Sequence, residues 1–511
     1  MHNRPTLPPV FWPGILGVAG VKLLLHLFVN TIYGFHRDEL LYLALGRHPD
    51  WGYWSNPPMI GWLGWMIEHT GDGPLWAVRL LPTLASCMLV GLAGIMAREL
   101  GGRRYAQFLA AAAVAVAPAY LRTGMLYQPV VFDILGWAAL CYLLLRYLNT
   151  ENRRYLWYFG LAFGLAFLNK YMVGFLLLAL VPALLLTPAR NVLWKKDTLI
   201  AAGLALLVIS PNLLWQYVHH FPVVNHMQAL RASQLVHVEP GSFLKDQLLM
   251  LFTASLVWVP GLWALASLRK GAYRPLLLLF IGVIVLLMAF QGKAYYTLGI
   301  YPVALAGGGV FWEKTLRNRA LRAALPLAML ALLLPLLPLA IPLYPPAKMA
   351  AYCRWAGQNL GLNDVNRWEN GRTYPLPQDY ADMLGWPELG RAAIAAYRQL
   401  PPGTPVLIYG ENYGQAGAVD YFGRLQGLPP AVSFSDTYRL WIPDSISAQA
   451  LIYINDNLGR DVHNLFADIR PVGSITDSLA REFGTTVYLC RQPRQDLDQF
   501  WRERIKIVRS Q

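Results

Sequence analysis

The sequence HRDELLYLALGRHPDWGYWSNPPMIGWL occupies residues 36–63, directly after an apolar run of membrane-span length from Val10 to Ile32. The stretch itself is too polar to cross a bilayer. It carries adjacent carboxylates at Asp38 and Glu39, which are costly beside a hydrophobic wall unless they bind a cation, take a proton or meet a partner. We therefore interpret it as an outer loop with a chemical role. A plain membrane-surface loop with solvated acids is the alternative.

The second half of this stretch is rich in aromatic residues and proline. The aromatic residues are Trp51, Tyr53, Trp54 and Trp62, and two prolines stand side by side at 57 and 58. Tryptophan and tyrosine collect at the headgroup layer, and proline stiffens the backbone. The pattern favours a first outer loop, about residues 33–74, with interfacial helices.

The composition indicates a polytopic membrane protein. The chain has 511 residues, of which 56% are hydrophobic and only 14% charged, and its mean hydropathy is +0.36. A soluble protein would carry roughly a quarter charged residues. The formal net charge of +14 is no nucleic-acid signal, because residues 1–343 hold 26 Lys and Arg against 12 Asp and Glu, whereas residues 344–511 hold 17 of each.

The hydropathy pattern predicts about eleven membrane spans. They are expected near residues 10–32, 75–97, 105–121, 131–148, 155–169, 172–188, 198–217, 248–268, 275–291, 297–312 and 323–343. Basic loops occupy every second connection, at 98–104, 149–154, 189–196, 268–274 and 313–322. Because positive loops stay cytoplasmic, we expect a cytoplasmic N-terminus and an extracytoplasmic region after residue 343. The first run is too long for a cleaved signal peptide.

Residues 344–511 are predicted to form a separate α/β domain outside the membrane. Strand signals lie at 405–410, 450–455 and 485–490, and a helical pattern lies at 387–400. The segment ENYGQAGAVDYFG, residues 411–423, does not match a dinucleotide or phosphate-binding loop, so a substrate-facing loop and a plain turn both stay open. Cys353 and Cys490 could pair in an oxidising compartment, and free thiols are the alternative.

Polar residues far apart in the chain are expected at the same outer boundary. The set comprises His36, Arg37, Asp38 and Glu39 in the first loop, Arg122, Tyr127, Gln128 and Asp133 around the second, Asn169, Lys170 and Tyr171 in the third, His219, His220, His226, Arg231 and His237 in the fourth, and residues 292–296 with Lys293, Tyr295 and Tyr296 in the fifth. The histidines lack the spacing of a zinc site.

Acids and lysines at one boundary suit a lipid-phosphate substrate. An ammonium group would neutralise a departing phosphate, and a carboxylate would deprotonate an attacking hydroxyl. Each residue also has a plainer explanation: Lys170 and Lys293 could snorkel at helix ends, and Tyr295 and Tyr296 could be interfacial aromatics. Asp133 is harder to explain without a partner, because it adjoins an apolar run.

The first-loop sequence RDELLYLALGRHPDWGYWSNPPMIGWL resembles the signature of the GT-C membrane glycosyltransferases, which include the protein O-mannosyltransferases and the lipid A aminoarabinose transferases. Further matching motifs are FDILGW (132–137), AFLNKYMVGF (166–175), SPNLLWQ (210–216), GKAYYTLGIYP (292–302), and GWPEL and ENYGQAGAVDYFG in the tail. The resemblance thus follows most of the chain, and the tail motif is typical of a broad bacterial branch of that family.

The resemblance implies an enzyme of the bacterial inner membrane that transfers a sugar, with inversion, from a polyprenyl-phosphate donor lipid to an extracytoplasmic lipid, glycan or protein hydroxyl. It implies Asp38 as base or acceptor-orienting carboxylate, Glu39 as its support and Asp133 as the second-loop acid. The substrate-binding residues it implies are Lys170 and Lys293 for the phosphate, with His36, Arg37, Tyr53, Asn56, Tyr171, Tyr295 and Tyr296. Asn56 stands where many relatives have histidine, so it can hydrogen-bond but cannot titrate.

No cofactor is expected to be required, since a carboxylate and a phosphate leaving group suffice; a divalent metal between Asp38 and Asp133 is possible but not favoured. Membrane lipids are expected partners, and nucleic acid is not. The runner-up interpretation is a transporter or lipid flippase, which would need mid-membrane polar sites and broken helices.

Overall fold

The computed structural model describes residues 7–69, 71, 73–233 and 239–509, so His237 lies outside the described residues. The chain separates into two compact units. The helical unit comprises Met1–Asn30, Asn56–Met59 and Trp76–Leu343. The sheet unit comprises Thr31–Ser55, Ile60–Leu75 and Tyr344–Gln511. Most of the first outer loop therefore groups with the C-terminal residues, whereas the sequence assigned it to residues 1–343.

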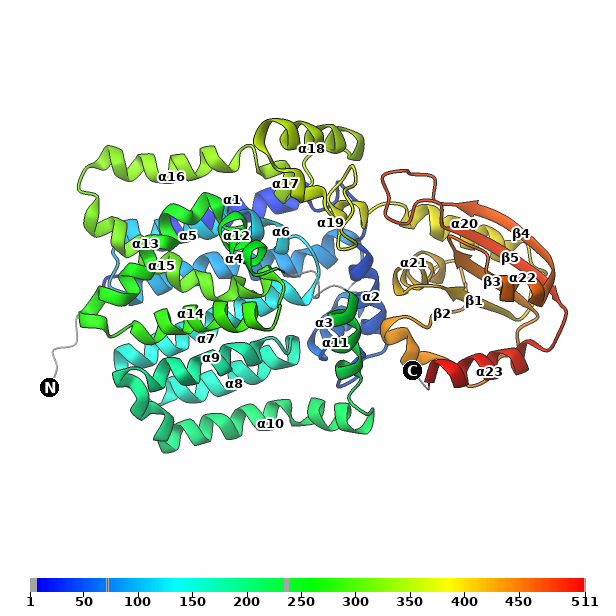
Figure 1. The fold of residues 1–511 in the computed structure, drawn as a ribbon, viewed down its shortest axis with the longest axis horizontal. Helices are drawn as coiled ribbons and strands as arrows, with labels where there is room; N and C mark the ends of the chain where they lie inside the picture. Colours follow the sequence, from blue (N-terminus) through cyan, green and yellow to red (C-terminus); the bar gives the residue numbers. More distant parts are fainter. Residues whose placement is uncertain (1–6, 70, 72, 234–238, 510–511) are drawn as a thin grey trace. The chain divides into compact units, whose positions relative to one another are not determined.

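The helical unit consists of helices joined by short connections (Figure 1). Its helices are α1 (Trp12–Val29), α4 (Leu75–Glu99), α5 (Arg104–Val116), α6 (Pro118–Thr123), α7 (Pro129–Thr150), α8 (Arg154–Asn169), α9 (Val173–Leu185), η1 (Pro188–Trp194), α10 (Lys196–Val218), α11 (Pro222–Ser233), α12 (Pro240–Met250), η3 (Phe252–Ala254), α13 (Ser255–Ser267), η4 (Leu268–Gly271), α14 (Arg274–Ala289), η5 (Ala294–Ile300), α15 (Tyr301–Thr315), α16 (Arg319–Leu333) and α17 (Leu337–Ala340).

Every apolar run singled out in the sequence is largely helical, but proline divides several of the runs. Among the described residues, four helices are long and apolar enough to cross a membrane, namely α1, α4, α7 and α10, and the pair 240–250 and 252–271, bent by 66°, makes a fifth if it is one span. The run 105–121 is split before Pro118, because proline cannot continue a helix from the preceding residue. The number of spans therefore stays a prediction.

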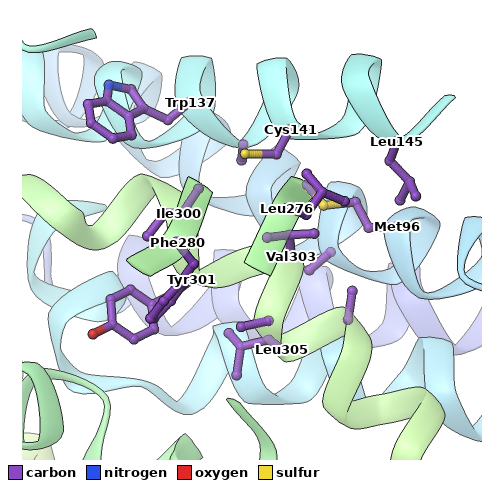
Figure 2. Packing of buried hydrophobic residues seen from close by; sticks show 14 of the residues in the cluster. Met96, Trp137, Cys141, Leu145, Leu276, Phe280, Ile300, Tyr301, Val303 and Leu305 are labelled. Carbon is purple, nitrogen blue, oxygen red and sulfur yellow. The ribbon is translucent and has the colours of Figure 1, made fainter. Parts of the chain in front are cut away.

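Small residues bring the central helices close together. An added Cβ on Gly308 of α15 would collide with the Val257 carbonyl of α13, and one on Gly309 would collide with the Ala106 carbonyl of α5. Such close approach increases dispersion contacts between helices in an apolar solvent. Large buried side chains, among them Trp137, Phe280 and Tyr301, belong to the same apolar core (Figure 2).

A buried carboxylate joins one end of several helices. Glu99, at the end of α4, is fully buried and accepts hydrogen bonds from the guanidinium groups of Arg98 and Arg146, both at 2.7 Å. Asn149 of α7 donates to the Glu99 main-chain carbonyl at 2.8 Å and accepts from Tyr273 at the start of α14. These bonds link α4, α7 and α14.

Helix α1 carries a buried polar row that the hydropathy pattern did not reveal. Lys22, His26 and Asn30 follow one another at intervals of four, so they share one helix face, and all are buried. Lys22 donates to the Tyr120 carbonyl at 3.0 Å, and Asn30 accepts from buried Arg79 at 2.6 Å through its main-chain carbonyl. This row attaches α1 to α4 and α6.

The sheet unit is built around a five-stranded mixed sheet of order β2-β1-β3-β5-β4 (Figure 1). β1 is parallel to β2 and β3, and β5 is antiparallel to β3 and β4. The strands are β1 (Val406–Gly410), β2 (Ala431–Val432), β3 (Ala450–Asn455), β4 (Phe466–Ser474) and β5 (Thr486–Pro493). The helices are α2 (Arg37–Arg47), α3 (Met59–His69), α18 (Pro346–Leu360), η6 (Asn363–Asn366), α19 (Gln378–Ala381), α20 (Trp386–Arg398), α21 (Tyr413–Arg424), η7 (Asp436–Trp441), α22 (Arg460–Leu465) and α23 (Leu497–Arg509).

The predicted strands and the predicted helix of the tail coincide with β1, β3, β5 and α20, while β2 and β4 were not predicted. Alternation along the strands gives the sheet two apolar faces. Helices α20 and α21 pack on one face, and Trp501 and Ile505 of α23 pack with Leu451 and Tyr453 on the other. All four cysteines are free thiols, so Cys353 and Cys490 do not pair.

Candidate functional site

The predicted site residues fall into two groups, one in each unit. His36, Arg37, Asp38, Glu39 and Tyr53 belong to the sheet unit. The members in the helical unit are Asn56, Asp133, Lys170, Tyr171, Lys293, Tyr295 and Tyr296.

The start of α2 is a capping box. The His36 imidazole accepts a hydrogen bond from the Asp38 main-chain N–H at 3.1 Å, and the Glu39 carboxylate accepts from the His36 main-chain N–H at 2.8 Å. This reciprocal arrangement satisfies N–H groups that the first turn of a helix leaves unpaired. Glu39 is fully buried. We therefore assign Glu39 to the framework of α2 and leave it out of the proposed chemistry.

Asp38 meets a tyrosine from the C-terminal part of the chain. The hydroxyl of Tyr413, the first residue of α21, donates to Asp38 Oδ1 at 2.8 Å. The Arg37 guanidinium lies 4.3 Å from the centroid of the Tyr413 ring. Burial and the neighbouring Asp38 carboxylate raise the pKa of Tyr413 well above its usual value, so the phenol stays protonated and acts as a donor.

A second set of charged residues, Asp382 and Arg481, lies next to the start of α2. Asp382 is buried, its carboxylate accepts from Arg481 at 3.1 Å and 3.2 Å, and its Oδ2 lies 3.9 Å from His36 Nε2. Burial raises the pKa of Asp382, while His36 and Arg481 oppose that shift. The Asp382 carbonyl also accepts from the Arg37 main-chain N–H at 3.0 Å. The N-terminus of α2 is therefore anchored to residues that follow it by more than three hundred positions.

Tyr53 has a packing role. Its side chain is buried, and its hydroxyl donates toward the carbonyls of Leu45 at 3.1 Å and His48 at 3.2 Å, at the end of α2. Burial raises the pKa of this phenol. We leave Tyr53 out of the proposed substrate-binding set, and Asn56, half-buried in the connection before α3, stays a predicted contact.

Two glycines of α21 allow α2 to approach closely. A Cβ on Gly414 would lie 2.7 Å from Arg37 Cγ, and one on Gly417 would lie 3.0 Å from Leu40 Cβ and 3.2 Å from the Leu40 main chain. The segment ENYGQAGAVDYFG is thus mostly helical rather than a substrate-facing loop or a plain turn: Glu411 and Asn412 follow β1, and Tyr413 begins α21, which receives α2.

The Gly417→Leu variant should destabilise the protein by about 1–3 kcal/mol, because the new side chain has no room against Leu40. Leucine is itself the better helix former, so intrinsic propensity favours the variant and cannot explain a loss. Thermal unfolding followed by circular dichroism measures the effect. Gly203→Leu in α10 is the matched control, since nothing lies within 4 Å of its added Cβ. Equal unfolding temperatures for both variants would contradict the assigned packing.

In the helical unit, an acid and a lysine come together from different helices. Asp133 of α7 is buried and accepts from the Trp137 indole N–H at 2.9 Å, one turn along the same helix. Lys170, in the connection after α8, is near enough for its charge to act on the Asp133 carboxylate. The Asp133 carboxylate therefore has a hydrogen-bond donor in Trp137 and an opposite charge nearby in Lys170.

Aromatic rings surround the Lys170 ammonium. Its Nζ lies 4.6 Å from the Tyr296 ring centroid and 5.3 Å from that of Tyr295. A cation over a tyrosine ring gains about 0.5–1 kcal/mol in exposed positions and more when desolvated. Lys293 precedes the same tyrosines and is the N-cap residue of η5. The connections that carry Lys170 and Tyr295–Tyr296 therefore meet, as the sequence predicted.

Tyr171 extends the group toward α10. Its hydroxyl donates to Asn212 at 3.1 Å and accepts from Gln216 at 3.0 Å. Burial raises the pKa of Tyr171 to about 12, so its phenol is neutral at physiological pH. Asn169, beside it, donates to the Pro129 carbonyl at 2.9 Å and so joins the end of α8 to the start of α7.

Two other residues of the predicted set have contacts in their own surroundings. Arg122 donates to the Leu339 carbonyl at 3.3 Å, and the His219 ring stacks on Trp215 at 4.0 Å. Among the described residues, no three His, Cys, Asp or Glu side chains come together as metal ligands would. The metal requirement stays a prediction.

The two groups are chemically distinct. The sheet-unit group presents a carboxylate held by a tyrosine hydroxyl, which suits proton transfer or orientation of a hydroxyl. The helical-unit group presents an ammonium among tyrosines, which suits an anionic oxygen such as a phosphate. Tyr413 was missed by the sequence analysis, and its signal lay in the tail motif that also resembles the family. The expected meeting of Asp38 with Lys170 and Lys293 stays a prediction.

Residues 55–215 match the family described as dolichyl-phosphate-mannose-protein mannosyltransferase. A similar protein is the lipid A galacturonosyltransferase RgtD of Rhizobium johnstonii, which is 32% identical over 225 residues; the match covers 42% of this chain and 46% of that protein. The chain thus spans about half the length of this curated relative.

The fold is similar to that of ArnT from Cupriavidus metallidurans. The crystal structure with undecaprenyl phosphate aligns over 94% of this chain and 98% of ArnT, with a TM-score of 0.62 and 15% identity. The apo structure aligns over 93% and 96%, with a TM-score of 0.59 and 14% identity. Family match, curated relative and fold agree, and they confirm that this chain resembles the multi-pass membrane glycosyltransferases of the GT-C superfamily.

Proposed function

We propose that the protein is an inverting glycosyltransferase of the bacterial inner membrane that uses a polyprenyl-phosphate-linked sugar as donor. The observation that carries this proposal is the grouping of Lys170 with Asp133, Tyr295 and Tyr296 from three separate segments, in a fold similar to that of a structure containing undecaprenyl phosphate. The acceptor is an extracytoplasmic hydroxyl, and lipid A is the first candidate because RgtD is a lipid A galacturonosyltransferase.

In the proposed reaction, Asp38 takes the proton of the acceptor hydroxyl. The acceptor oxygen forms a bond to the anomeric carbon, while the bond between that carbon and the phosphate oxygen breaks. The electron pair leaves with the polyprenyl phosphate, whose charge Lys170 and Lys293 stabilise. The configuration inverts in this single displacement, and no covalent enzyme intermediate forms. The Asp133 carboxylate places an opposite charge near the Lys170 ammonium.

The test is sugar transfer by the purified protein in proteoliposomes. Undecaprenyl-phosphate-linked galacturonic acid, mannose and aminoarabinose, each radiolabelled in the sugar, are offered with lipid A and with a membrane-lipid extract. We expect the label of at least one donor to move to an acceptor, with release of undecaprenyl phosphate. Movement of intact donor across the bilayer without loss of its sugar would instead support the transporter interpretation.

Lys170→Met should lower kcat/KM for the donor by about 10–100-fold, because a charge-assisted hydrogen bond to phosphate contributes about 1.5–3 kcal/mol. Lys195→Met is the matched control, since Lys195 also lies over a tyrosine ring, 5.5 Å from that of Tyr147, but in a predicted cytoplasmic loop. Binding of undecaprenyl phosphate, followed by tryptophan fluorescence, should weaken only in Lys170→Met. Equal behaviour of the two variants would remove Lys170 from the phosphate site.

A further inference from the structure

Tyr413 joins the C-terminal region to the first loop at Asp38, the carboxylate proposed to act as base. Its hydroxyl lies 2.8 Å from Asp38 Oδ1, although 375 positions separate the two residues in the sequence. We propose that Tyr413 is a positioning residue for Asp38, so that the C-terminal region completes the catalytic centre rather than only covering it. This inference rests on the proposed function, because it needs Asp38 to act in transfer.

The first turn of α21 is held in place by its own bonds. Asn412 caps the helix by accepting from the main-chain N–H groups of Gly414 at 2.9 Å and Gln415 at 3.1 Å. The side-chain amides of Asn412 and Gln415 both donate to the Glu482 carboxylate, at 3.2 Å and 2.8 Å. Glu482 thus fixes the turn from which Tyr413 projects, and rigid support is what a positioning group requires.

The ring of Tyr413 is fixed as well as its backbone. The Arg37 guanidinium lies over one face of the ring, and Gly414 leaves room for the Arg37 stem beside Trp386. Arg37 precedes Asp38 directly, so the residue beside the carboxylate also orients the tyrosine. The stacking therefore couples the position of the phenol to the first turn of α2.

These contacts orient one oxygen of the Asp38 carboxylate and leave part of the side chain exposed to a substrate. Tyr413 binds Oδ1, His36 Nδ1 lies 3.9 Å from Oδ2, and the Asp38 side chain retains 29% exposure. A carboxylate that cannot rotate presents a constant lone-pair direction to an acceptor hydroxyl, which lowers the cost of reaching the productive geometry. A purely structural Tyr413 would instead contribute only to stability.

The experiment compares Tyr413→Phe with Tyr438→Phe in the proteoliposome transfer assay. Tyr438 is the matched control, because its buried hydroxyl also donates to an aspartate in the same unit, Asp420 Oδ2 at 2.7 Å. We expect Tyr413→Phe to lower kcat by about 10–100-fold with KM for the donor and the affinity for undecaprenyl phosphate within twofold of wild type. Tyr438→Phe should retain the wild-type kcat.

The double variant Asp38→Asn/Tyr413→Phe separates positioning from other roles. Since Tyr413 acts through Asp38, adding Tyr413→Phe to Asp38→Asn should cause no further loss. Any of three results would overturn the proposal: wild-type kcat in Tyr413→Phe, equal losses of kcat in Tyr413→Phe and Tyr438→Phe, or a further loss in the double variant.

If Tyr413→Phe does not fold, 3,5-difluorotyrosine at position 413 keeps the shape of the side chain. It should lose kcat at a lower alkaline pH than tyrosine, and an unchanged profile would overturn the proposal.

The outcomes also distinguish this inference from the proposed function. If the wild-type protein transfers sugar from no donor, the proposed function fails. If the wild type is active and Asp38→Asn is equally active, the role of Asp38 fails. If the wild type is active, Asp38→Asn is inactive and Tyr413→Phe behaves as wild type, only the role of Tyr413 fails.

Discussion

Asp38→Asn should lower kcat for sugar transfer by about 10²–10⁴-fold, the range in which a positioned general base contributes. The asparagine carbonyl oxygen can still accept the hydrogen bond that Tyr413 donates at 2.8 Å, so the contact between α2 and α21 should persist. The variant therefore removes the ability to take a proton and leaves the packing intact. The measurement is transfer of labelled sugar in proteoliposomes, with thermal unfolding as a check of the fold.

The control for this prediction is Asp50→Asn, which changes an exposed carboxylate of the same loop. Asp50 accepts a hydrogen bond from the adjacent Trp51 main-chain N–H at 2.7 Å, so it has a local turn role. Its variant should transfer sugar at the wild-type rate. Retention of full activity by Asp38→Asn would remove this carboxylate from the reaction.

Glu99→Ala should destabilise the protein by about 3 kcal/mol, the lower end of what breaking a buried ion pair costs. The carboxylate is fully buried, whereas its partners Arg98 and Arg146 are partly exposed and keep some water, which limits the cost. Denaturant unfolding in mixed micelles measures the change. Without Glu99, the Arg146 guanidinium loses a 2.7 Å bond, and α4 and α7 lose a shared contact.

Asp444→Ala provides the comparison. The Asp444 carboxylate pairs with Arg509 at 2.6 Å but is 81% exposed, and solvent-exposed pairs contribute about 0–1 kcal/mol. Its removal should change the unfolding midpoint little. A Glu99→Ala protein as stable as the Asp444→Ala protein would mean that the buried network adds no net stability.

Many helices of the helical unit were predictable, because a long apolar run predicts a helix without any knowledge of what the helix packs against. The grouping of Lys170 with Tyr295 and Tyr296 also followed from the sequence, since alternate basic loops assigned these residues to the same side of the membrane. The buried Lys22 and His26 were not predicted. Averaging over a span dilutes single polar residues, and Lys22 donates to a main-chain carbonyl, which no side-chain pattern reveals.

The sheet-unit site could be predicted only in part. Asp38 was identifiable because adjacent carboxylates follow an apolar run, and the His36–Glu39 capping box is a local motif that was present but not recognised. Tyr413 was not predictable, since contacts across hundreds of residues depend on how separate elements pack. Gly414 and Gly417, which allow α21 to pack against α2, are equally typical of a turn in the sequence.

The grouping of residues 31–55 with residues 344–511 has a consequence for biosynthesis. When the ribosome has made the first loop, Leu40 of α2 still lacks the helix against which it packs. That partner, α21, emerges only after the intervening helices have been synthesised. The first loop cannot complete this packing until α21 has been made, so a chain that stops before α21 should be more prone to aggregation and proteolysis.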